Sequence, residues 1–247
     1  MTVRARVLDV LLVALLVAYV MVAIAWLWTS PWLLTLLLIP PPLILATRAA
    51  STREAAILAF AGILLGPFTE ACSVAGGLWT YQATGGLPLV PPWIFPLWGC
   101  FTPALWIVVR SISLRLPRPQ VPAFHLVWLG LALAIEIIAY IELGHSTPLA
   151  LAATVPLAAL LLGFSRRLEV VIILLFGSVL GPLCESLPIA FGAWTYPNPE
   201  LLGMPAWLPL GYGIFGVIVA LSAEAALALL PAPQTLSATT SSQGSPA

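Results

Sequence analysis

The sequence has few charged residues and no lysine. Of its 247 residues only 7% are charged, whereas 61% are hydrophobic. An ordinary soluble domain contains about 25% charged residues. A soluble fold of this size needs a polar surface that this composition does not supply, so a water-soluble globular domain is excluded. The formal net charge is zero and no run of basic residues exists, which excludes nucleic acid as an expected partner.

Metal-binding and disulfide patterns are also missing from the sequence. The three cysteines, Cys72, Cys100 and Cys184, form no CxxC pair, and the two histidines lie far apart in the sequence. Buried cysteine usually behaves as a small apolar residue. We therefore expect no metal site, no disulfide framework and no cofactor.

Apolar stretches close to the length that crosses a hydrocarbon core of about 30 Å recur along the chain. They predict an all-α, polytopic membrane helix bundle embedded in a lipid bilayer. The predicted spans are eight in number and cover residues 7–28, 32–47, 54–77, 93–109, 123–141, 148–164, 169–192 and 207–230. The small polar residues of the tail, 231–247, cannot bury a core and predict disorder.

The basic residues, which are all arginines, test this count of spans. Eight spans place every arginine on one side, in segments 4–6, 48–53, 110–118 and 166–167. A count with one span fewer would scatter the arginines over both sides. By the positive-inside rule the arginine side is cytoplasmic. We therefore expect a bacterial plasma-membrane protein with both termini in the cytoplasm.

The two halves of the sequence resemble one another. Residues 54–81 and 169–196 align without a gap at an offset of 115, and 12 of the 28 positions are identical. The shared pattern is G-x3-G-P-x2-E-x6-G-x-W-T-Y. Since each half would contain four spans, the halves would share one orientation around an axis along the membrane normal. We divide the chain into two parallel membrane repeats, 1–118 and 119–230, followed by the tail 231–247.

Glu70 and Glu185 occupy equivalent positions in this pattern. Glu70 follows Glu54 by 16 residues, which is about 24 Å of helix at 1.5 Å per residue. Both glutamates are therefore expected in the outer part of the bilayer. A carboxylate at membrane depth is costly, so such a residue is a candidate functional group.

A structural role for the glutamates is an equally open alternative. Gly66-Pro67 and Gly181-Pro182 have the pattern of helix restarts, because proline is favoured in the first turn of a helix. Gly-Pro breaks are therefore predicted inside both spans. An acidic side chain in a first turn interacts favourably with the helix N-terminus, so each glutamate would cap the break beside it.

The chemical alternative requires the two carboxyls to meet. If the pseudo-twofold axis brings Glu70 and Glu185 together, repulsion and desolvation should keep at least one of them protonated at neutral pH. A carboxyl that faces a carboxylate is suited to general acid–base catalysis on an apolar substrate. Both residues are therefore the candidate catalytic residues.

Aromatic residues follow each glutamate at identical spacing. Trp79 and Tyr81 follow Glu70, and Trp194 and Tyr196 follow Glu185. An interfacial aromatic belt, common in membrane proteins, would explain them, but a belt does not require the same spacing in both halves. We interpret these four residues, together with Glu136 in the middle of the fifth span, as candidate substrate-binding residues.

A family resemblance agrees with this interpretation. The run Glu185-x6-Gly192-x-Trp194-x-Tyr196, followed by Leu202-Gly203-x-Pro205 and Pro209-Leu210, resembles polytopic carotenoid-biosynthesis membrane proteins of the carotenoid hydratase type. The first half repeats it as Glu70, Gly77, Trp79, Tyr81, Pro92 and Pro96. Small membrane lycopene cyclases also carry acidic residues and a G-x-W element. The resemblance covers about thirty residues in each half and implies that intramembrane acids protonate an isoprenoid double bond.

Three functions remain open from the sequence. The first is an intramembrane enzyme that acts on an isoprenoid or other apolar lipid through glutamate acid–base chemistry. The second is a transporter for a lipid or small molecule, with broken helices framing its cavity. The third is a membrane scaffold in which the glutamates and aromatic residues only hold the fold.

Overall fold

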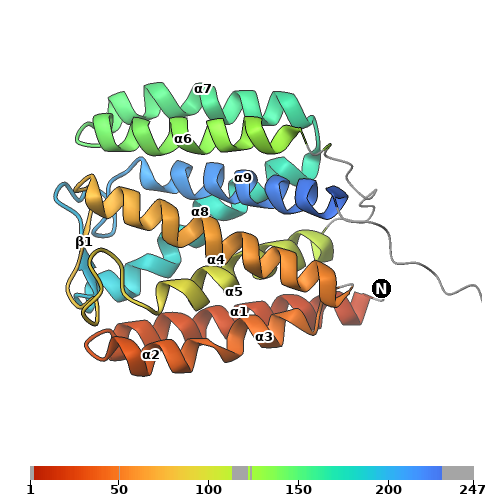
Figure 1. Cartoon of the computed structure of the whole chain (residues 1–247), viewed down its shortest axis with the longest axis horizontal. Coiled ribbons are helices and arrows are strands. Elements are labelled where there is room, and N and C mark those ends of the chain that lie inside the picture. Colours follow the sequence, from red (N-terminus) through yellow and green to blue (C-terminus); the bar gives the residue numbers. More distant parts are fainter. Residues whose placement is uncertain (1–2, 50, 113–121, 123, 230–247) are drawn as a thin grey trace, which may run out of the picture.

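The structure is a computed structural model that describes residues 3–49, 51–112, 122 and 124–229. Its elements are α1 (Val3–Leu27), α2 (Pro31–Leu38), α3 (Pro40–Ala46), α4 (Thr52–Ala75), β1 (Thr80–Tyr81), α5 (Ile94–Ile112), α6 (His125–Leu143), α7 (Thr147–Ser165), α8 (Leu168–Ala190), β2 (Trp194–Thr195) and α9 (Leu208–Leu229) (Figure 1). Within the described residues, seven helices are long and apolar enough to cross a membrane. The prediction of an all-α polytopic membrane protein is confirmed. The boundary at 118 and the tail 231–247 lie outside the described residues.

The predicted span 32–47 forms two short helices instead of one. The helix is interrupted between α2 and α3 at Ile39, immediately before Pro40, Pro41 and Pro42. Proline lacks the amide hydrogen of the helical ladder and its ring clashes with the carbonyl four residues earlier. Figure 1 shows α2 and α3 end to end beside α1. Because neither helix alone has the length of a span, the count of eight stays a prediction.

The expected Gly-Pro helix breaks are wrong. Pro67 lies inside the continuous helix α4, and Pro182 lies inside the continuous helix α8. Proline is tolerated in membrane helices because neighbouring helices compensate for the lost backbone hydrogen bond. Here α5 packs along α4, and α9 packs along α8. Glu70 and Glu185 are consequently in helix interiors, so neither caps a helix restart.

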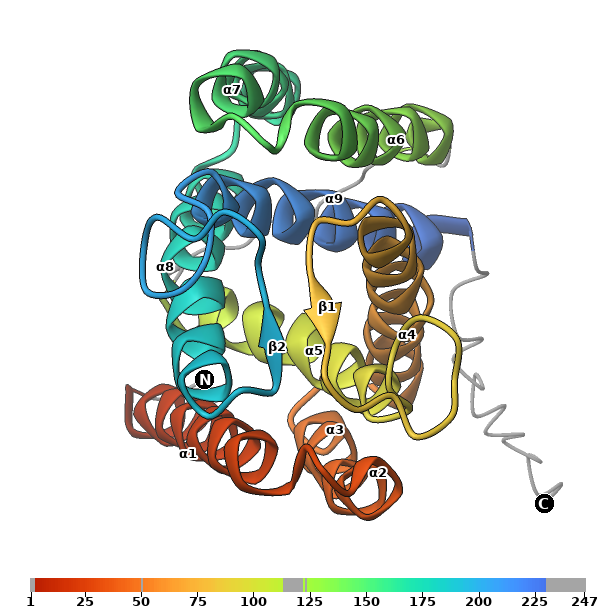
Figure 2. The same ribbon diagram turned by 90° about the vertical axis from the view of Figure 1, so that its left-hand side faces the viewer.

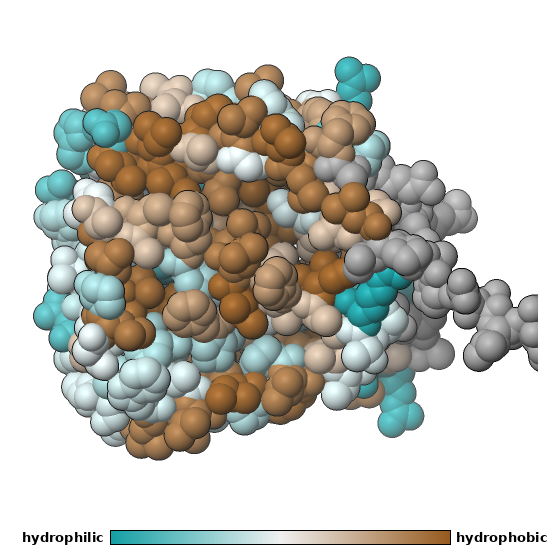
Figure 3. Space-filling model, in the orientation of Figure 1, coloured by the Kyte–Doolittle hydropathy of each residue, from teal (hydrophilic) through white to brown (hydrophobic). Residues whose placement is uncertain are grey.

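The helices form an inner group and two outer groups. Figure 2 shows α4, α5, α8 and α9 around the centre, with α1, α2 and α3 on one side and α6 and α7 on the other. In α5 and α9, 72% and 67% of the residues of the apolar segment are buried, against 33% in α1, α4, α6 and α8 and 28% in α7. The outer helices expose large apolar side chains such as Leu15, Val127 and Leu160. Figure 3 shows this apolar surface along the side of the bundle, where lipid chains would contact it.

The arginine-bearing helix ends lie together at one end of the bundle, on the right in Figure 1. Two ion pairs join inner helices there. Arg110 lies 3.3 Å from Glu54, between α5 and α4, and Arg167 at the start of α8 lies 2.8 Å from Glu224 on α9. This grouping is what the positive-inside argument requires. The cytoplasmic side and the plasma membrane stay predictions.

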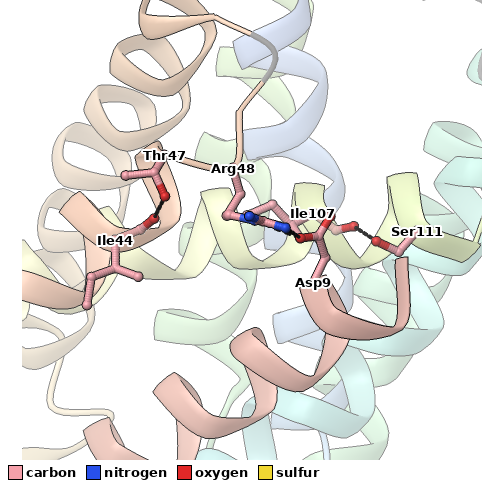
Figure 4. A network of polar contacts seen from close by, with 6 residues as sticks. All are labelled: Asp9, Ile44, Thr47, Arg48, Ile107 and Ser111. Atoms are coloured by element: carbon pink, nitrogen blue, oxygen red, sulfur yellow. Dashed lines mark hydrogen bonds and ion pairs between the residues drawn. The ribbon is translucent and has the colours of Figure 1, made fainter. Parts of the chain in front are cut away.

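A third ion pair fixes the outer group at the same end. Figure 4 shows Arg48, which follows α3, contacting Asp9 on α1. Arg48 Nε donates to Asp9 Oδ1 at 2.7 Å, and its terminal nitrogen contacts the same oxygen. Asp9 is only 5% exposed. The guanidinium therefore neutralises a buried carboxylate and connects the α2–α3 segment to α1.

Replacing Arg48 by methionine is expected to destabilise the bundle. The change leaves the buried Asp9 carboxylate without its cation, a situation that costs about 2 kcal/mol or more. Thermal unfolding in detergent measures the effect. Arg4→Met, at the exposed start of α1, is the control and should leave the melting temperature unchanged. An unchanged melting temperature for Arg48→Met would contradict a stabilising role for the pair.

Candidate functional site: a pair of buried glutamates

The two predicted catalytic residues lie on the inner helices. Glu70 comes from α4 and is 7% exposed, and Glu185 comes from α8 and is 9% exposed. Both lie in the last turns of their helices, near the end of the bundle that carries β1 and β2 (Figure 1). The sequence argument placed them at this level. What it did not supply was the set of side chains that surrounds each carboxyl.

Two donors hold the Glu70 carboxyl. The Tyr81 hydroxyl donates to Oε2 at 2.7 Å, and the Trp98 indole Nε1 donates to Oε1 at 3.2 Å. Tyr81 belongs to β1 and Trp98 to α5. Both carboxyl oxygens are therefore bonded to side chains from other elements, which is how a protein stabilises a buried polar group.

The Glu185 carboxyl has a matching arrangement. The Tyr196 hydroxyl donates to Oε2 at 2.7 Å, and the Tyr212 hydroxyl donates to Oε1. Tyr196 follows β2, and Tyr212 lies on α9. The first and second halves thus use equivalent tyrosines, Tyr81 and Tyr196. The halves differ in the other donor, which is the indole of Trp98 in the first half and the phenol of Tyr212 in the second.

Pairing of β1 with β2 places the predicted aromatic residues over the centre of the bundle. The strands are antiparallel, with Thr80 opposite Thr195 and Tyr81 opposite Trp194 (Figure 2). The ring centroids of Tyr81 and Trp194 are 5.7 Å apart, and those of Trp79 and Tyr196 are 5.5 Å apart. Each half therefore packs its aromatic residues against those of the other half. All four residues are buried, whereas the residues of an interfacial belt would be exposed to lipid.

The glycines of the repeated pattern determine how closely the inner helices approach. A Cβ atom at Gly66 would lie 2.1 Å from Cγ of Trp98, and one at Gly181 would lie 2.1 Å from Cγ of Tyr212. The Trp98 and Tyr212 rings therefore lie directly on backbone that has no side chain. Small residues permit this close contact between membrane helices. The glycine thus positions the ring that donates to the glutamate one turn later.

Burial affects the phenols outside the spanning helices. It raises the pKa of Tyr81 well above its usual value, and the neighbouring Glu70 carboxyl raises this pKa further. The pKa of Tyr196 is raised in the same way, first by burial and then by Glu185. Both phenols therefore keep their hydrogens at neutral pH and act as donors to the carboxyls.

Two cavities meet at the glutamate pair. The first cavity, between α1, α5 and α8, has a volume of about 90 Å³ and is lined by Met21, Trp93, Trp98, Cys184, Glu70 and Glu185 among others. The second cavity, between α4, α6 and α9, has a volume of about 60 Å³ and is lined by Glu136, Tyr140, Trp207, Tyr212, Glu70 and Glu185 among others. Both carboxyls line both cavities. The structure therefore brings the two predicted catalytic residues to one shared site.

The predicted binding residues also lie at this site, and Glu136 is the first of them. It comes from α6, is 3% exposed and lines the second cavity. Its Oε2 atom has no hydrogen-bond partner among the described residues. Of the other predicted binding residues, Trp79 lines the second cavity, and Tyr81 and Trp194 line the first. Tyr196 reaches the site through Glu185.

Sequence reasoning missed Trp98 and Tyr212. The signal is present at an offset of 114, which pairs Trp93-x4-Trp98-Gly99-x-Phe101 with Trp207-x4-Tyr212-Gly213-x-Phe215. The offset of the main alignment is 115, so one residue is lost in the outer loops. The Pro96-Leu97 and Pro209-Leu210 pairs align at a third offset, 113, which obscures the pairing of the two aromatic donors.

Within the described residues, no group of three or more histidine, cysteine, aspartate or glutamate side chains is placed to hold a metal ion. The three cysteines are free thiols. The polar chemistry of this part of the chain is therefore that of carboxyls, phenols and indoles.

Comparison with known proteins identifies the fold. No family model and no curated protein matches this chain. Two solved structures of the Insig homologue MvINS do match, each with a TM-score of 0.55, over 73% of this chain and 97% of that chain. One is MvINS from Mycobacterium vanbaalenii, at 23% identity, and the other is a cross-linked MvINS trimer, at 24% identity. These matches do not bear on the carotenoid-biosynthesis resemblance. The chain is therefore a multi-pass integral membrane protein similar in fold to a mycobacterial Insig homologue.

Proposed function

We propose that this protein is an intramembrane enzyme that moves protons to and from carbon atoms of an isoprenoid or another apolar lipid. Glu70 and Glu185 are its acid–base pair. The observation that carries the proposal is that both carboxyls line the same two cavities between apolar helices. A lipid that enters these cavities would meet two ionisable groups away from bulk water, which is the arrangement that general acid–base catalysis needs.

The hydrogen-bond partners assign the two roles. Trp98 Nε1 can only donate, so Glu70 Oε1 must accept its hydrogen. Both oxygens of Glu185 instead face phenol hydroxyls, and a hydroxyl can either donate or accept. Glu185 therefore keeps its partners with a proton on either oxygen, whereas Glu70 keeps them only with a proton on Oε2, which bonds the Tyr81 hydroxyl. On this difference we assign Glu185 as the acid and Glu70 as the base.

The reaction is balanced without an oxidant or reductant. Glu185 gives its proton to one carbon of a C=C bond, and the π electrons form the new C–H bond. The other carbon becomes a carbocation. Glu70 removes a proton from an adjacent carbon, and the electrons of that C–H bond form a shifted double bond. Glu70 then holds the proton that Glu185 has lost, and exchange with water restores the starting state.

Aromatic rings of the first cavity support the cationic intermediate. Trp93, Trp98 and Trp194 line this cavity together with both carboxyls. The face of an aromatic ring attracts a cation, and tryptophan does so most strongly. An apolar cavity with several indoles beside an acid therefore suits a reaction that passes through a carbocation better than it suits the passage of a hydrophilic solute.

The internal repeat is part of the proposal. We infer that residues 1–118 and 119–230 are parallel repeats of four crossings each, with α2 and α3 together making the second crossing. Thr80 pairs with Thr195, its own equivalent in the repeat. This register and the equivalent tyrosine donors support the inference of two parallel repeats. The arginine end would face the cytoplasm of a bacterial cell. The resemblance to carotenoid-biosynthesis proteins favours an isoprenoid as the substrate.

Deuterium incorporation tests the proposed function. The full-length protein in lipid nanodiscs is incubated in D2O with lycopene or squalene, and the recovered lipid is analysed by mass spectrometry. Wild-type protein is expected to place deuterium on carbon, because Glu185 exchanges its proton with solvent between turnovers. The Glu70→Gln/Glu185→Gln double variant should place none. Equal incorporation by the double variant, or none by the wild type with either lipid, would refute the proposal.

A further inference from the structure

The second cavity contains two polar atoms that the acid–base pair does not use. One is Oε2 of Glu136 and the other is the hydroxyl oxygen of Tyr140, and neither has a hydrogen-bond partner among the described residues. Glu136 is 3% exposed and Tyr140 is 6% exposed. A buried polar atom without a partner costs about 1–3 kcal/mol. A protein that retains two such atoms in one cavity is expected to gain a ligand contact from them.

The geometry places both atoms at one location. Glu136 and Tyr140 are four residues apart on α6, and residues with this spacing are neighbours on one helix face. Both line the second cavity. Thr154 lies close to Tyr140, but its hydroxyl donates to the carbonyl oxygen of Ala150 at 2.8 Å, so its only hydrogen is not available to the Tyr140 hydroxyl. On the opposite wall, a Cβ atom at Gly211 would lie 3.1 Å from the Tyr140 hydroxyl, so the glycine leaves space beside that hydroxyl.

The first cavity lacks an equivalent of this polar pair. In the repeat that we propose, the offset of 115 pairs Met21, which lines the first cavity, with Glu136, which lines the second. A thioether in one cavity thus stands where a carboxyl stands in the other. The two cavities share the Glu70 and Glu185 carboxyls. Beyond that pair, and counting partners among the described residues, the second cavity has an unpartnered carboxyl oxygen and hydroxyl, whereas the first has the unpartnered indole Nε1 of Trp93, which can donate but not accept.

We propose that Glu136 and Tyr140 form a subsite for a hydroxyl group at one end of the lipid that occupies the second cavity. This inference rests on the proposed function for its lipid ligand. An alcohol can donate its hydrogen to Glu136 Oε2 and accept one from Tyr140. With Glu136 Oε2 as an acceptor, a carbonyl or an ether would satisfy only Tyr140, and an ammonium would satisfy only Glu136. The ligand class is therefore an isoprenoid or other long-chain alcohol, with its apolar chain directed toward the glutamate pair.

Binding measurements with three probes test the subsite. The full-length protein in detergent is titrated with geranylgeraniol, with its methyl ether and with the corresponding hydrocarbon. Quenching of tryptophan fluorescence reports binding, since Trp79, Trp98 and Trp207 line the second cavity. Wild-type protein is expected to bind the alcohol about tenfold more tightly than either other probe, the effect of one to two buried hydrogen bonds.

Glu136→Met is the decisive variant, because it gives the second cavity the residue that stands in the first. It should bind all three probes equally, while Met21→Leu should keep the tenfold preference. The melting temperature of Glu136→Met should stay level or rise, since Oε2 loses no partner. Equal binding of the three probes by the wild type, as expected if only water contacts these atoms, would overturn the subsite. A preference that survives in Glu136→Met would also overturn it.

The result is separable from the test of the proposed function. Loss of the alcohol preference in Glu136→Met would support the subsite even if the Glu70→Gln/Glu185→Gln variant still incorporated deuterium, in which case only the acid–base proposal fails. Deuterium incorporation that depends on Glu70 and Glu185, together with equal binding of the three probes, would refute the subsite alone.

Discussion

Glu70→Gln and Glu185→Gln are each expected to lower the rate of deuterium incorporation about a thousandfold, within the range that general acid–base catalysis contributes. Glutamine has the shape of glutamate and keeps both partners in either position. Its carbonyl oxygen accepts from one neighbour, and its amide donates to a phenol oxygen such as that of Tyr81 or Tyr196. What it cannot do is exchange a proton, so activity falls while the fold persists.

The initial rate and the melting temperature together check this prediction. Glu142→Gln is the control, because Glu142 is exposed on α6 and lines neither cavity. It should retain the wild-type rate. Since the two glutamates act as one unit, the double variant should be hardly slower than either single variant. A single variant with the wild-type rate would show that its glutamate serves the fold and not the chemistry.

The spans and the depth of the glutamates follow from local sequence. Long apolar runs determine where a chain crosses a membrane, and the observed ends of α4 (Thr52–Ala75) and α8 (Leu168–Ala190) lie within two residues of the predicted ones. Counting residues from Glu54 placed Glu70 near one end of its helix. These inferences depend only on residues that belong to the same helix.

The effect of proline was harder to predict, because it depends on the packing around each helix. Gly66-Pro67 was expected to break its span, yet α4 continues through it, whereas the consecutive prolines 40–42 do interrupt a span expected to be continuous. A single proline removes one backbone hydrogen bond, which tight packing on α5 can offset. Consecutive prolines remove several, and the outer α2–α3 segment has fewer neighbouring helices to compensate.

The donors to the carboxyls could not be found from the motif alone. Trp98 and Tyr212 belong to helices that follow outer loops of unequal length, so the repeat offset changes before it reaches them. Their role depends on a long-range contact, the ring of one helix on the glycine of another. Likewise, the mid-span position of Glu136 suggested a function. Only the packing of α6 against α9 shows that its Oε2 atom has no hydrogen-bond partner among the described residues.

Gly66→Ala and Gly181→Ala are expected to be strongly destabilising substitutions in the inner helices. The added methyl group would lie 2.1 Å from a ring carbon of Trp98 or Tyr212, so helix or ring must move. Overpacking a core typically costs 1–3 kcal/mol. The displaced ring also withdraws its hydrogen from a buried glutamate, which adds a penalty of similar size. We expect a loss of about 3 kcal/mol or more for each variant.

Gly130→Ala is the matched control for this prediction. Gly130 lies inside α6 with no other atoms within 4 Å of an added Cβ, and alanine is favoured over glycine in a helix by about 1 kcal/mol. Thermal unfolding should therefore show a level or higher melting temperature for Gly130→Ala and a large decrease for Gly66→Ala. Adding Trp98→Ala to Gly66→Ala removes the ring that causes the clash. The loss in the double variant should then be smaller than the sum of the two single losses, because residues in contact do not act additively. If the losses were additive, the destabilisation would come from the helix backbone, and the glycine would have no part in positioning the donor to Glu70.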